Sequence, residues 1–393
     1  MIRIREISLQ PEHSVAQLPY EAARALRISV SKIRKLSIVR RSMDALKKPD
    51  IKIVYTVDVA VDGSENKILK QSGCKRAAIA DNRYYKVPKC AQAPEHRPVV
   101  VGFGPAGMFA ALVLALAGLK PLVLERGEDA VSRHEKVKTF WKTGHLDGKS
   151  NVQFGEGGAG TYSDGKLKSG AMDKYKMKVL STFVDSGAPE DILYSATAHL
   201  GTDRLSDIVA AIRNRIISLG GEISYSSKLT EIVSKNGTVA AVEYKKDGQE
   251  ITLPATDVIL AIGHSARDTI SKIYDLGVKM EAKGFGIGVR IEHPREYIND
   301  LVYGKGHDTR LESASYHLVT HLENGRSVYS FCMCPGGTVV AATSEEGSVV
   351  TNGMSEYMRD GRNSNAAFLV SVTPADFPDS TALGGFALQR EIE

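Results

Sequence analysis

The fold of this chain is decided by residues 97–126, which read RPVVVGFGPAGMFAALVLALAGLKPLVLER. The β-branched run at 99–101 is typical of a central parallel strand, which is buried on both faces. Gly102, Gly104 and Gly107 follow it with the spacing GxGxxG. This spacing allows a tight turn, a close approach of the backbone to a pyrophosphate, and close packing of the next helix on the sheet. The stretch therefore predicts a dinucleotide site.

The residues after the turn supply the context that a lone glycine pattern lacks. We expect an apolar helix over 105–118, whose N-terminus offers free N–H groups to a phosphate. A second strand at 120–124 ends in Glu125, about 20 residues beyond the turn, where a carboxylate can accept ribose hydroxyls. The same carboxylate would repel the 2′-phosphate of NADP. The alternative interpretation is a purely structural glycine turn.

Length and composition bound the class of protein. The 393 residues predict two or three domains, and 42% hydrophobic and 25% charged residues are ordinary for a globular protein. No apolar run reaches the ~18 residues of a membrane span, and the N-terminus lacks the pattern of a signal peptide. Four cysteines in so long a chain make no disulfide framework. We expect a cytoplasmic protein.

Charge is distributed unevenly along the chain. Residues 1–98 hold 20 Lys and Arg against 10 Asp and Glu, whereas the remainder holds 31 against 36. A basic segment can bind nucleic acid, a membrane surface or an acidic partner. No aromatic residue is interleaved with the basic cluster 40–52 before Tyr55, so stacking on bases is not supported. A solvated basic face is the favoured interpretation, and nucleic acid is the less favoured one.

The N-terminal segment, residues 1–90, is predicted to be a small basic α/β domain. We expect a strand from Ile2, helices at 20–27 and 29–36, and a strand at 51–61. The proline-bearing stretch 86–98 is expected to be a linker.

A second glycine-rich stretch lies at 151–167 and reads NVQFGEGGAGTYSDGKL. Its five glycines rule out a stable helix or strand. It is either a flexible surface loop or a loop that lets a flat cofactor lie close to the backbone. Phe154, Tyr162 and Leu167 can anchor it to a core, which favours the cofactor loop. Beyond it we expect an amphipathic helix at 205–219, strands at 222–225 and 229–233, a hairpin at 238–254, and a buried strand at 257–262 that runs into Gly263.

This order of elements resembles the glutathione-reductase-type FAD-binding fold. Ala261-Ile262-Gly263 matches its second motif, usually Ala-Thr-Gly, with Ile in the middle place. The loop at 154–167 and the run CMCPGG at 332–337 resemble, more narrowly, a bacterial family of FAD-dependent dehydrogenases of unassigned substrate with an extra N-terminal α/β domain. The resemblance covers essentially the whole chain.

The resemblance implies an α/β protein with three parts. These are a small domain at 1–90, a Rossmann-like FAD-binding domain at 91–267 with the inserted hairpin, and a substrate domain with an antiparallel sheet at 268–393. Flavoproteins of this fold usually close the FAD site with a late Gly-Asp motif and a terminal helix, which do not occur before Glu393. We therefore expect the last domain to be C-terminally incomplete.

The resemblance also assigns roles around a tightly held FAD. The pyrophosphate would face the three glycines of the turn, the ribose would face Glu125, and adenine would meet the backbone of Leu229. The loop at 155–166 would lie along the isoalloxazine, with Lys166 or Lys168 near the N1–C2 carbonyl. The expected FAD-binding residues are Gly102, Gly104, Pro105, Ala106, Gly107, Glu125, Arg126, Gly158, Ala159, Gly160, Thr161, Asp164, Lys166, Leu229, Ala261 and Gly263.

Four residues are candidates for catalysis. Cys332 and Cys334 would point to one face of a strand, either as a redox pair or reactive thiol near the flavin, or as two small core residues. Arg290 can hold an anionic substrate, and His293 is either a proton donor or a structural histidine. The neighbouring histidines are too few to suggest a metal site.

These features predict an FAD-dependent oxidoreductase that transfers hydride between bound flavin and NAD(P)H or an organic small-molecule substrate. Only one complete GxGxxG unit occurs, because the glycines at 284–288 precede a strand rather than a helix. NAD(P)H would therefore arrive transiently from solution. A flavin-dependent RNA-modifying enzyme and a non-catalytic flavin sensor are the alternatives. The sequence does not determine the substrate or the oligomeric state.

Overall fold

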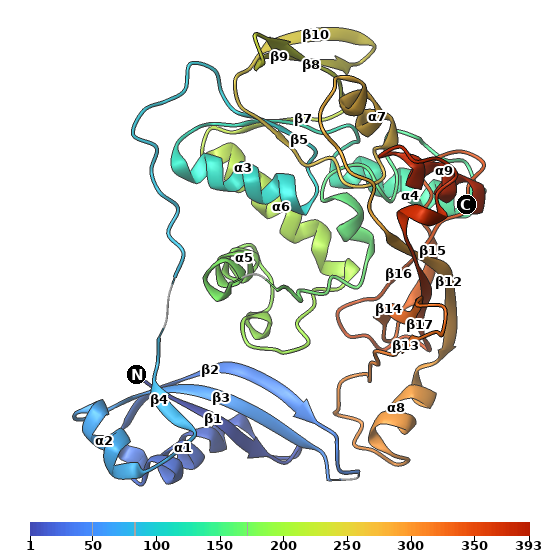
Figure 1. The fold of residues 1–393 in the computed structure, drawn as a ribbon. Coiled ribbons are helices and arrows are strands. Elements are labelled where there is room, and N and C mark those ends of the chain that lie inside the picture. Colours follow the sequence, from blue (N-terminus) through green and yellow to red (C-terminus); the bar gives the residue numbers. More distant parts are fainter. Residues whose placement is uncertain (49, 82–83, 171) are drawn as a thin grey trace. The chain divides into compact units, whose positions relative to one another are not determined.

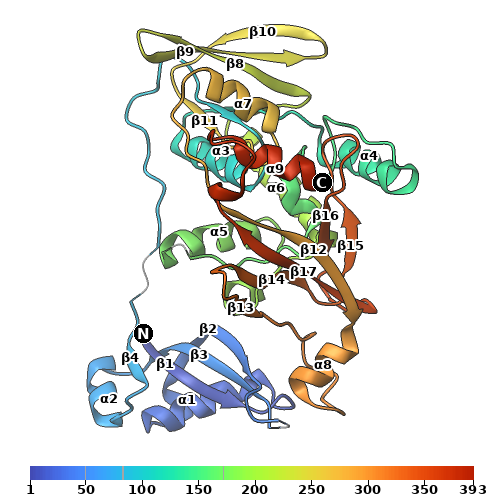
Figure 2. The same ribbon diagram turned by 45° about the vertical axis from the view of Figure 1, so that its right-hand side comes forward.

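Figure 1 and Figure 2 show the computed structural model, which describes residues 1–393 except 49, 82, 83 and 171. Backbone contacts divide the chain into two compact units. The first unit consists of Met1–Tyr85, Lys166–Leu200 and Pro294–Ser315, and the second consists of Lys86–Gly165, Gly201–His293 and Tyr316–Glu393. Two later segments therefore return to the N-terminal unit, which the sequence-based boundaries at 90 and 267 do not include.

The first unit is built on a four-stranded sheet in the order β2-β3-β1-β4. Its N-terminal elements are β1 (Ile2–Leu9), α1 (Leu18–Leu26), β2 (Ile33–Asp44), β3 (Lys52–Val61), α2 (Glu65–Ser72) and β4 (Ala77–Ile79). The sheet and α1 bury one apolar core that includes Ile4, Leu26 and Val57. The returning segments carry α5 (Asp173–Asp185) and α8 (Arg295–Tyr303).

The predicted helix at 29–36 is wrong. Only Val30–Lys32 forms a short 3-10 turn, and Ile33 begins the long strand β2. Strand β2 pairs with β3 along its length, and Ile33, Leu36 and Ile38 pack against the core. Tertiary pairing, which the local sequence does not show, decides this segment.

The second unit contains the predicted dinucleotide-binding elements. Strands β5 (Val99–Val101), β6 (Leu122–Leu124), β7 (Glu222–Ser224) and β11 (Val258–Leu260) form a parallel sheet in the order β11-β5-β6-β7. Helix α3 (Pro105–Ala117) follows β5 and lies beside α6 (Thr202–Ser218), as Figure 1 shows. The strand, turn, helix and strand expected around Gly102 are confirmed.

Strand β11 differs from the expectation of a buried strand. Ile259 and Leu260 are 38% and 41% exposed. Among the residues that the structure describes, β11 pairs only with β5 and so forms an edge of the sheet. An apolar run alone does not tell an edge strand from a central one.

The predicted hairpin is present as β9 (Thr238–Lys246) and β10 (Gln249–Pro254), and β8 (Ser227–Lys235) extends it to three strands. Leu229, Val242 and Tyr244 of this small sheet pack against Leu122 and Leu124 of the parallel sheet. This contact fixes the start of β8 close to the end of β6.

The second unit contains further helices and strands. They are α4 (Ala130–Thr143), α7 (Arg267–Asp275), β12 (Phe285–Pro294), β13 (Val319–His321), β14 (Ser327–Cys334), β15 (Thr338–Ala341), β16 (Thr351–Met354), β17 (Asn363–Val372) and α9 (Gly384–Ile392). Strands β12-β17-β14-β13 form one sheet, and β15 pairs with β16. The polar sequences at 353–355 and 359–365 predict loops, but 353–354 belong to β16 and 363–365 belong to β17. Within the described residues, no helix combines the length and apolar character needed to cross a membrane.

Candidate functional site

A cavity of about 420 Å³ lies in the second unit at the carboxyl ends of β5, β6 and β11. Its volume falls in the range of small-molecule and cofactor sites. Open parallel sheets bind ligands at this end of their strands. The lining residues are Val101, Gly102, Gly104, Pro105, Ala106, Leu124, Glu125, Arg126, Gln153, Phe154, Gly155, Gly158, Ala159, Gly160, Ser227, Leu229, Leu260, Ala261, Ile262, Gly263, His264, Ser265, Ala266 and Thr269.

The first glycine turn is shaped by close backbone packing. Gly102 has φ +97°, and a Cβ there would lie 2.4 Å from the carbonyl oxygen of Ala261. A Cβ on Gly107 would lie 1.9 Å from the carbonyl oxygen of Gly102. Gly104 differs, because a Cβ there would contact only the Cα of Gly158, at 3.7 Å. Gly104 therefore borders the cavity, and it is the N-cap of α3 without a capping side chain.

Glu125 fastens both glycine loops to each other. Its side chain is only 5% exposed. Its Oε2 accepts from the N–H of Phe103 at 2.6 Å, and its Oε1 accepts from Gly127 and Gly155 at 2.8 and 3.0 Å. A carboxylate offers about four acceptor positions. The chain itself uses three of them, which leaves room for one ligand hydroxyl rather than the expected pair.

The second glycine loop lies directly on the first. The N–H of Gly157 donates to the carbonyl oxygen of Phe103 at 2.9 Å. A Cβ on Gly158 would lie 2.9 Å from the Cα of Gly104, and a Cβ on Gly127 would lie 2.6 Å from the Cα of Gly155. At these contacts there is no space for a side chain, so glycine is required.

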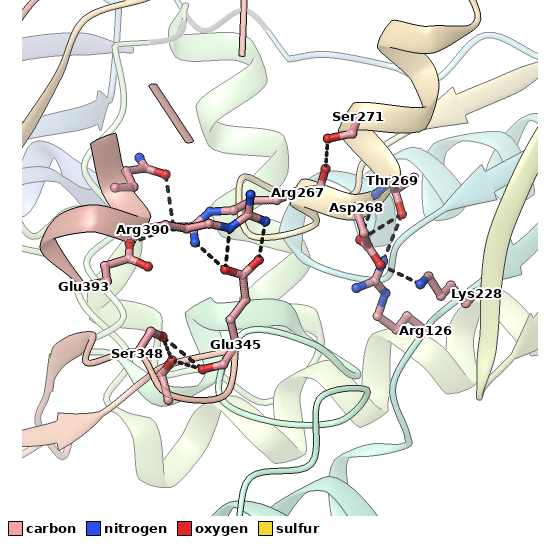
Figure 3. Close-up of polar contacts among 12 residues, drawn as sticks. Arg126, Lys228, Arg267, Asp268, Thr269, Ser271, Glu345, Ser348, Arg390 and Glu393 are labelled. Atoms are coloured by element: carbon pink, nitrogen blue, oxygen red, sulfur yellow. Dashed lines mark hydrogen bonds and ion pairs between the residues drawn. The ribbon is translucent and has the colours of Figure 1, made fainter. Parts of the chain in front are cut away.

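Arg126 forms part of the cavity wall. Its Nη2 donates to Asp268 at 2.7 Å and to Thr269 at 2.9 Å (Figure 3), and its guanidinium lies 4.4 Å from the ring centroid of Phe154. Lys228 approaches the other oxygen of Asp268 at 2.5 Å. Burial alone would raise the pKa of Asp268, but hydrogen bonds from Lys228 and Arg126 hold it well below its ordinary value. The ionised carboxylate therefore keeps Arg126 in place.

Several polar residues of the cavity were not predicted. Ser265 contacts Gln153 at 3.2 Å and His264 at 3.2 Å. Burial, helped by the charge of Arg267, lowers the pKa of His264, so this imidazole is neutral at pH 7. His264 and Ser265 directly follow the Ala-Ile-Gly motif, so the sequence could have indicated them as cavity residues. Nothing in the sequence indicated Thr269, because only the position of α7 brings it to the site.

Most of the expected FAD-binding residues line the cavity, but four do not: Gly107, Thr161, Asp164 and Lys166. Gly107 packs beneath the turn. The carbonyl oxygen of Thr161 accepts from Thr202. Asp164 is buried against Arg359, whose Nε donates to it at 2.9 Å. Lys166 belongs to the first unit, where it forms an isolated β-bridge with His199. Cofactor roles for these residues stay predictions.

Three of the four catalytic candidates lie together in the second unit. Arg290 donates to Asn365 at 2.6 Å and to the carbonyl oxygen of Cys332 at 3.3 Å. Cys334 is fully buried, and its Sγ lies 3.2 Å from the same carbonyl. A Cβ on Gly353 would lie 2.3 Å from Arg290, so glycine is needed for this approach.

His293 is separated from this cluster by strand geometry. Residues three apart on a strand point to opposite faces, and the imidazole lies 5.5 Å from the ring of Tyr316. Burial lowers its pKa, and neither ring nitrogen has a hydrogen-bond partner among the described residues. None of the four catalytic candidates lines the cavity described above.

The cavity suits FAD in its chemistry. The first turn of α3 presents N–H groups beside Gly104, which lines the cavity. Glu125 keeps one acceptor position that a ligand hydroxyl could use. Phe154, Leu229 and Ile262 supply an apolar surface for aromatic rings.

Comparisons with known proteins agree with this cofactor. Residues 284–393 match the family described as FAD-dependent protein, C-terminal domain-like, and residues 1–60 match a domain of unknown function, DUF8436. An uncharacterized protein of Clostridium beijerinckii (strain ATCC 51743 / NCIMB 8052) is 46% identical over 395 residues, which cover 100% of this chain and 73% of that protein.

Similar solved structures include the flavin-dependent brominase Bmp2 and the glycerol-3-phosphate dehydrogenase of Bacillus halodurans complexed with FAD. Both are 12% identical, with TM-scores of 0.37 and 0.33. They cover 75% and 74% of this chain, which spans 62% and 49% of theirs. Such a low sequence identity and TM-score do not indicate an activity for this chain. FAD is the cofactor that the family match supports, and the chain belongs to the same family as the Clostridium beijerinckii protein.

Proposed function

We propose that this protein is an FAD-dependent oxidoreductase of the glutathione-reductase type, which transfers hydride between bound flavin and NAD(P)H or an organic substrate. The main observation in support is that two glycine loops, both hydrogen-bonded to Glu125, border a cavity at the carboxyl ends of the parallel strands. FAD, when bound, supplies a ring that accepts or donates a hydride.

The residues of the chain bind and orient the cofactor. The N–H groups at the start of α3 hold the pyrophosphate, and the remaining acceptor position of Glu125 holds a ribose hydroxyl. The neutral imidazole of His264 and the hydroxyl of Ser265 offer hydrogen bonds along the wall without adding charge. Arg126, fixed by Asp268, supplies a cation at the wall.

NAD(P)H is proposed to bind transiently, because the chain holds one complete dinucleotide motif. The glycines at 284–288 open strand β12 and are not followed by a helix N-terminus. A phosphate-binding helix is therefore missing from that motif in the described part of the chain.

Arg290 is proposed to contact an anionic group of the substrate. Its guanidinium is partly buried, and in the described part of the chain it donates to neutral acceptors, the side-chain amide oxygen of Asn365 and the carbonyl oxygen of Cys332. The structure describes no ion pair between Arg290 and a carboxylate. A fixed guanidinium fork without an acidic partner suits a carboxylate.

The test is an anaerobic titration of the FAD-loaded protein with NADH and then with NADPH, followed by the visible flavin absorption. Bleaching by one donor at a stoichiometric amount is the expected result. Flavin that stays oxidised with both donors contradicts the NAD(P)H reductase proposal. If organic acids also fail to reduce it, the non-catalytic sensor becomes the better account.

A further inference from the structure

Arg133 of α4 is the largest fully buried side chain among the described residues. Its guanidinium donates to four backbone carbonyl oxygens of the second glycine loop. Nε reaches Asn151 at 2.8 Å, Nη1 reaches Glu156 at 2.6 Å, and Nη2 reaches Val152 at 2.9 Å and Gly158 at 2.8 Å. The loop therefore folds around this one side chain.

Burying this guanidinium costs folding free energy, which indicates that the arrangement serves a function. Burying a cation without an ion pair is costly, and no carboxylate lies in salt-bridge contact with Arg133 among the described residues. Burial lowers the pKa of Arg133 to about 10, while the nearby charges of Glu125 and Glu156 oppose the shift. The guanidinium thus remains charged at pH 7, and carbonyl dipoles compensate it.

Gly155 connects Arg133 to the cavity. It has φ +119°, and a Cβ there would lie 2.5 Å from Cδ of Arg133. Its N–H donates to Glu125, and it lines the cavity. The backbone at Gly155 therefore lies between the side chain of Arg133 and the carboxylate of Glu125, which lines the cavity.

We infer that Arg133 is the positioning residue of the cofactor site, which holds residues 151–158 in the conformation that receives FAD without touching FAD itself. The inference rests on the proposed function in taking FAD as the ligand. A glycine-rich loop loses much conformational entropy when it becomes ordered. Because Arg133 already orders the loop when the protein folds, FAD binding does not lose this conformational entropy again.

The test uses R133K and R133A, with R326K as the control. Lysine has one compact ammonium and cannot reproduce a planar fork to four carbonyls. Arg326 donates to Asp376 and to the carbonyl oxygen of Ser371, away from the loop. FAD affinity is measured by quenching of FAD fluorescence, and amide hydrogen exchange of residues 151–158 is measured in the protein without FAD.

We expect R133K and R133A to bind FAD at least about tenfold more weakly, since hydrogen bonds from a charged group are lost. Loop exchange should accelerate by a similar factor, and R326K should stay within about twofold on both measures. Millimolar guanidinium should restore part of the affinity of R133A, whereas sodium chloride at equal ionic strength should not.

Wild-type affinity and wild-type loop exchange in both Arg133 variants would overturn the inference. If the wild-type protein binds no FAD, the proposed function fails, and loop exchange still decides whether Arg133 orders the loop. If R133A does not fold, R133K and G155A carry the test, because G155A crowds Arg133 without removing its charge.

Discussion

Glu125 illustrates how one side chain serves both structure and ligand. The glycine spacing and the end of a strand predicted its position, and the structure adds three N–H donors from separate segments. The sequence did not reveal those donors, because they belong to residues 103, 127 and 155, which only the fold brings together. For the same reason the sequence did not indicate a role for Arg133, which appears there only as one arginine in a polar helical stretch.

Replacing Glu125 by Gln should destabilise the second unit by about 1–3 kcal/mol, because the amide NH₂ would face an N–H donor and leave it unpaired. Urea unfolding monitored by circular dichroism measures the change. Glu222→Gln is the control, since that carboxylate forms an exposed pair with Arg97 and should change stability by less than about 1 kcal/mol. Equal effects of the two variants would mean that the three N–H contacts contribute little.

His264 should make stability depend on pH. Its folded-state pKa is lowered, so the unfolded chain binds the proton more tightly, and unfolding free energy should fall as pH drops below the ordinary value of about 6.5. His264→Gln should reduce this fall without removing it, because the pKa values of His134 and His293 are lowered too. Unfolding free energies at pH 8 and pH 5 compare the variants. An unchanged difference would show that His264 does not contribute.

Among the helices and strands of the second unit, most were predicted by hydrophobic periodicity and by the glycines and capping residues at the ends of segments. The polar stretch 130–143 predicts a helix, and α4 spans these residues, since Asp129 caps it and Gly144 follows it. The strand character of β2 and the exposure of β11 were missed for one reason. Whether an apolar segment pairs on one side, on both sides or not at all is decided by distant strands.

The contact between the two glycine loops gives the next prediction. Gly158→Ala should weaken FAD binding by about tenfold or more, because the residue has φ +61° and its Cβ would approach Gly104. Gly148→Ala is the matched control, since its φ is not positive and a Cβ there meets nothing within 4 Å. FAD titration of both variants is the measurement. Undiminished affinity in Gly158→Ala would mean that the loops do not need this close contact.

At the scale of the whole molecule, the chain passes between two units several times, and Asp164 lies just before one such crossing. Arg359 and Ser355 bind its buried carboxylate, and its carbonyl oxygen accepts from Gly201, where the chain re-enters the second unit. The return of 166–200 to the first unit was not predictable, because it depends on long-range contacts such as Arg41 with Tyr194.

Asp164→Ala should cost about 3–5 kcal/mol in the stability of the second unit, since it leaves the buried Arg359 without its carboxylate. Denaturant unfolding measures it. Glu135→Ala, which removes an exposed pair with Lys138, should have little effect. A small effect of Asp164→Ala would mean that its buried pair with Arg359 contributes little to the stability of the second unit.

The cavity beside Gly104 is proposed as the FAD site. An FAD titration of the wild-type chain and of Gly104→Asp, followed by flavin fluorescence, tests this assignment. We predict saturable binding of one FAD per chain, and its loss in the variant, whose carboxylate would enter the cavity and repel the pyrophosphate. Equal binding by both proteins, or none by the wild type, would contradict the account.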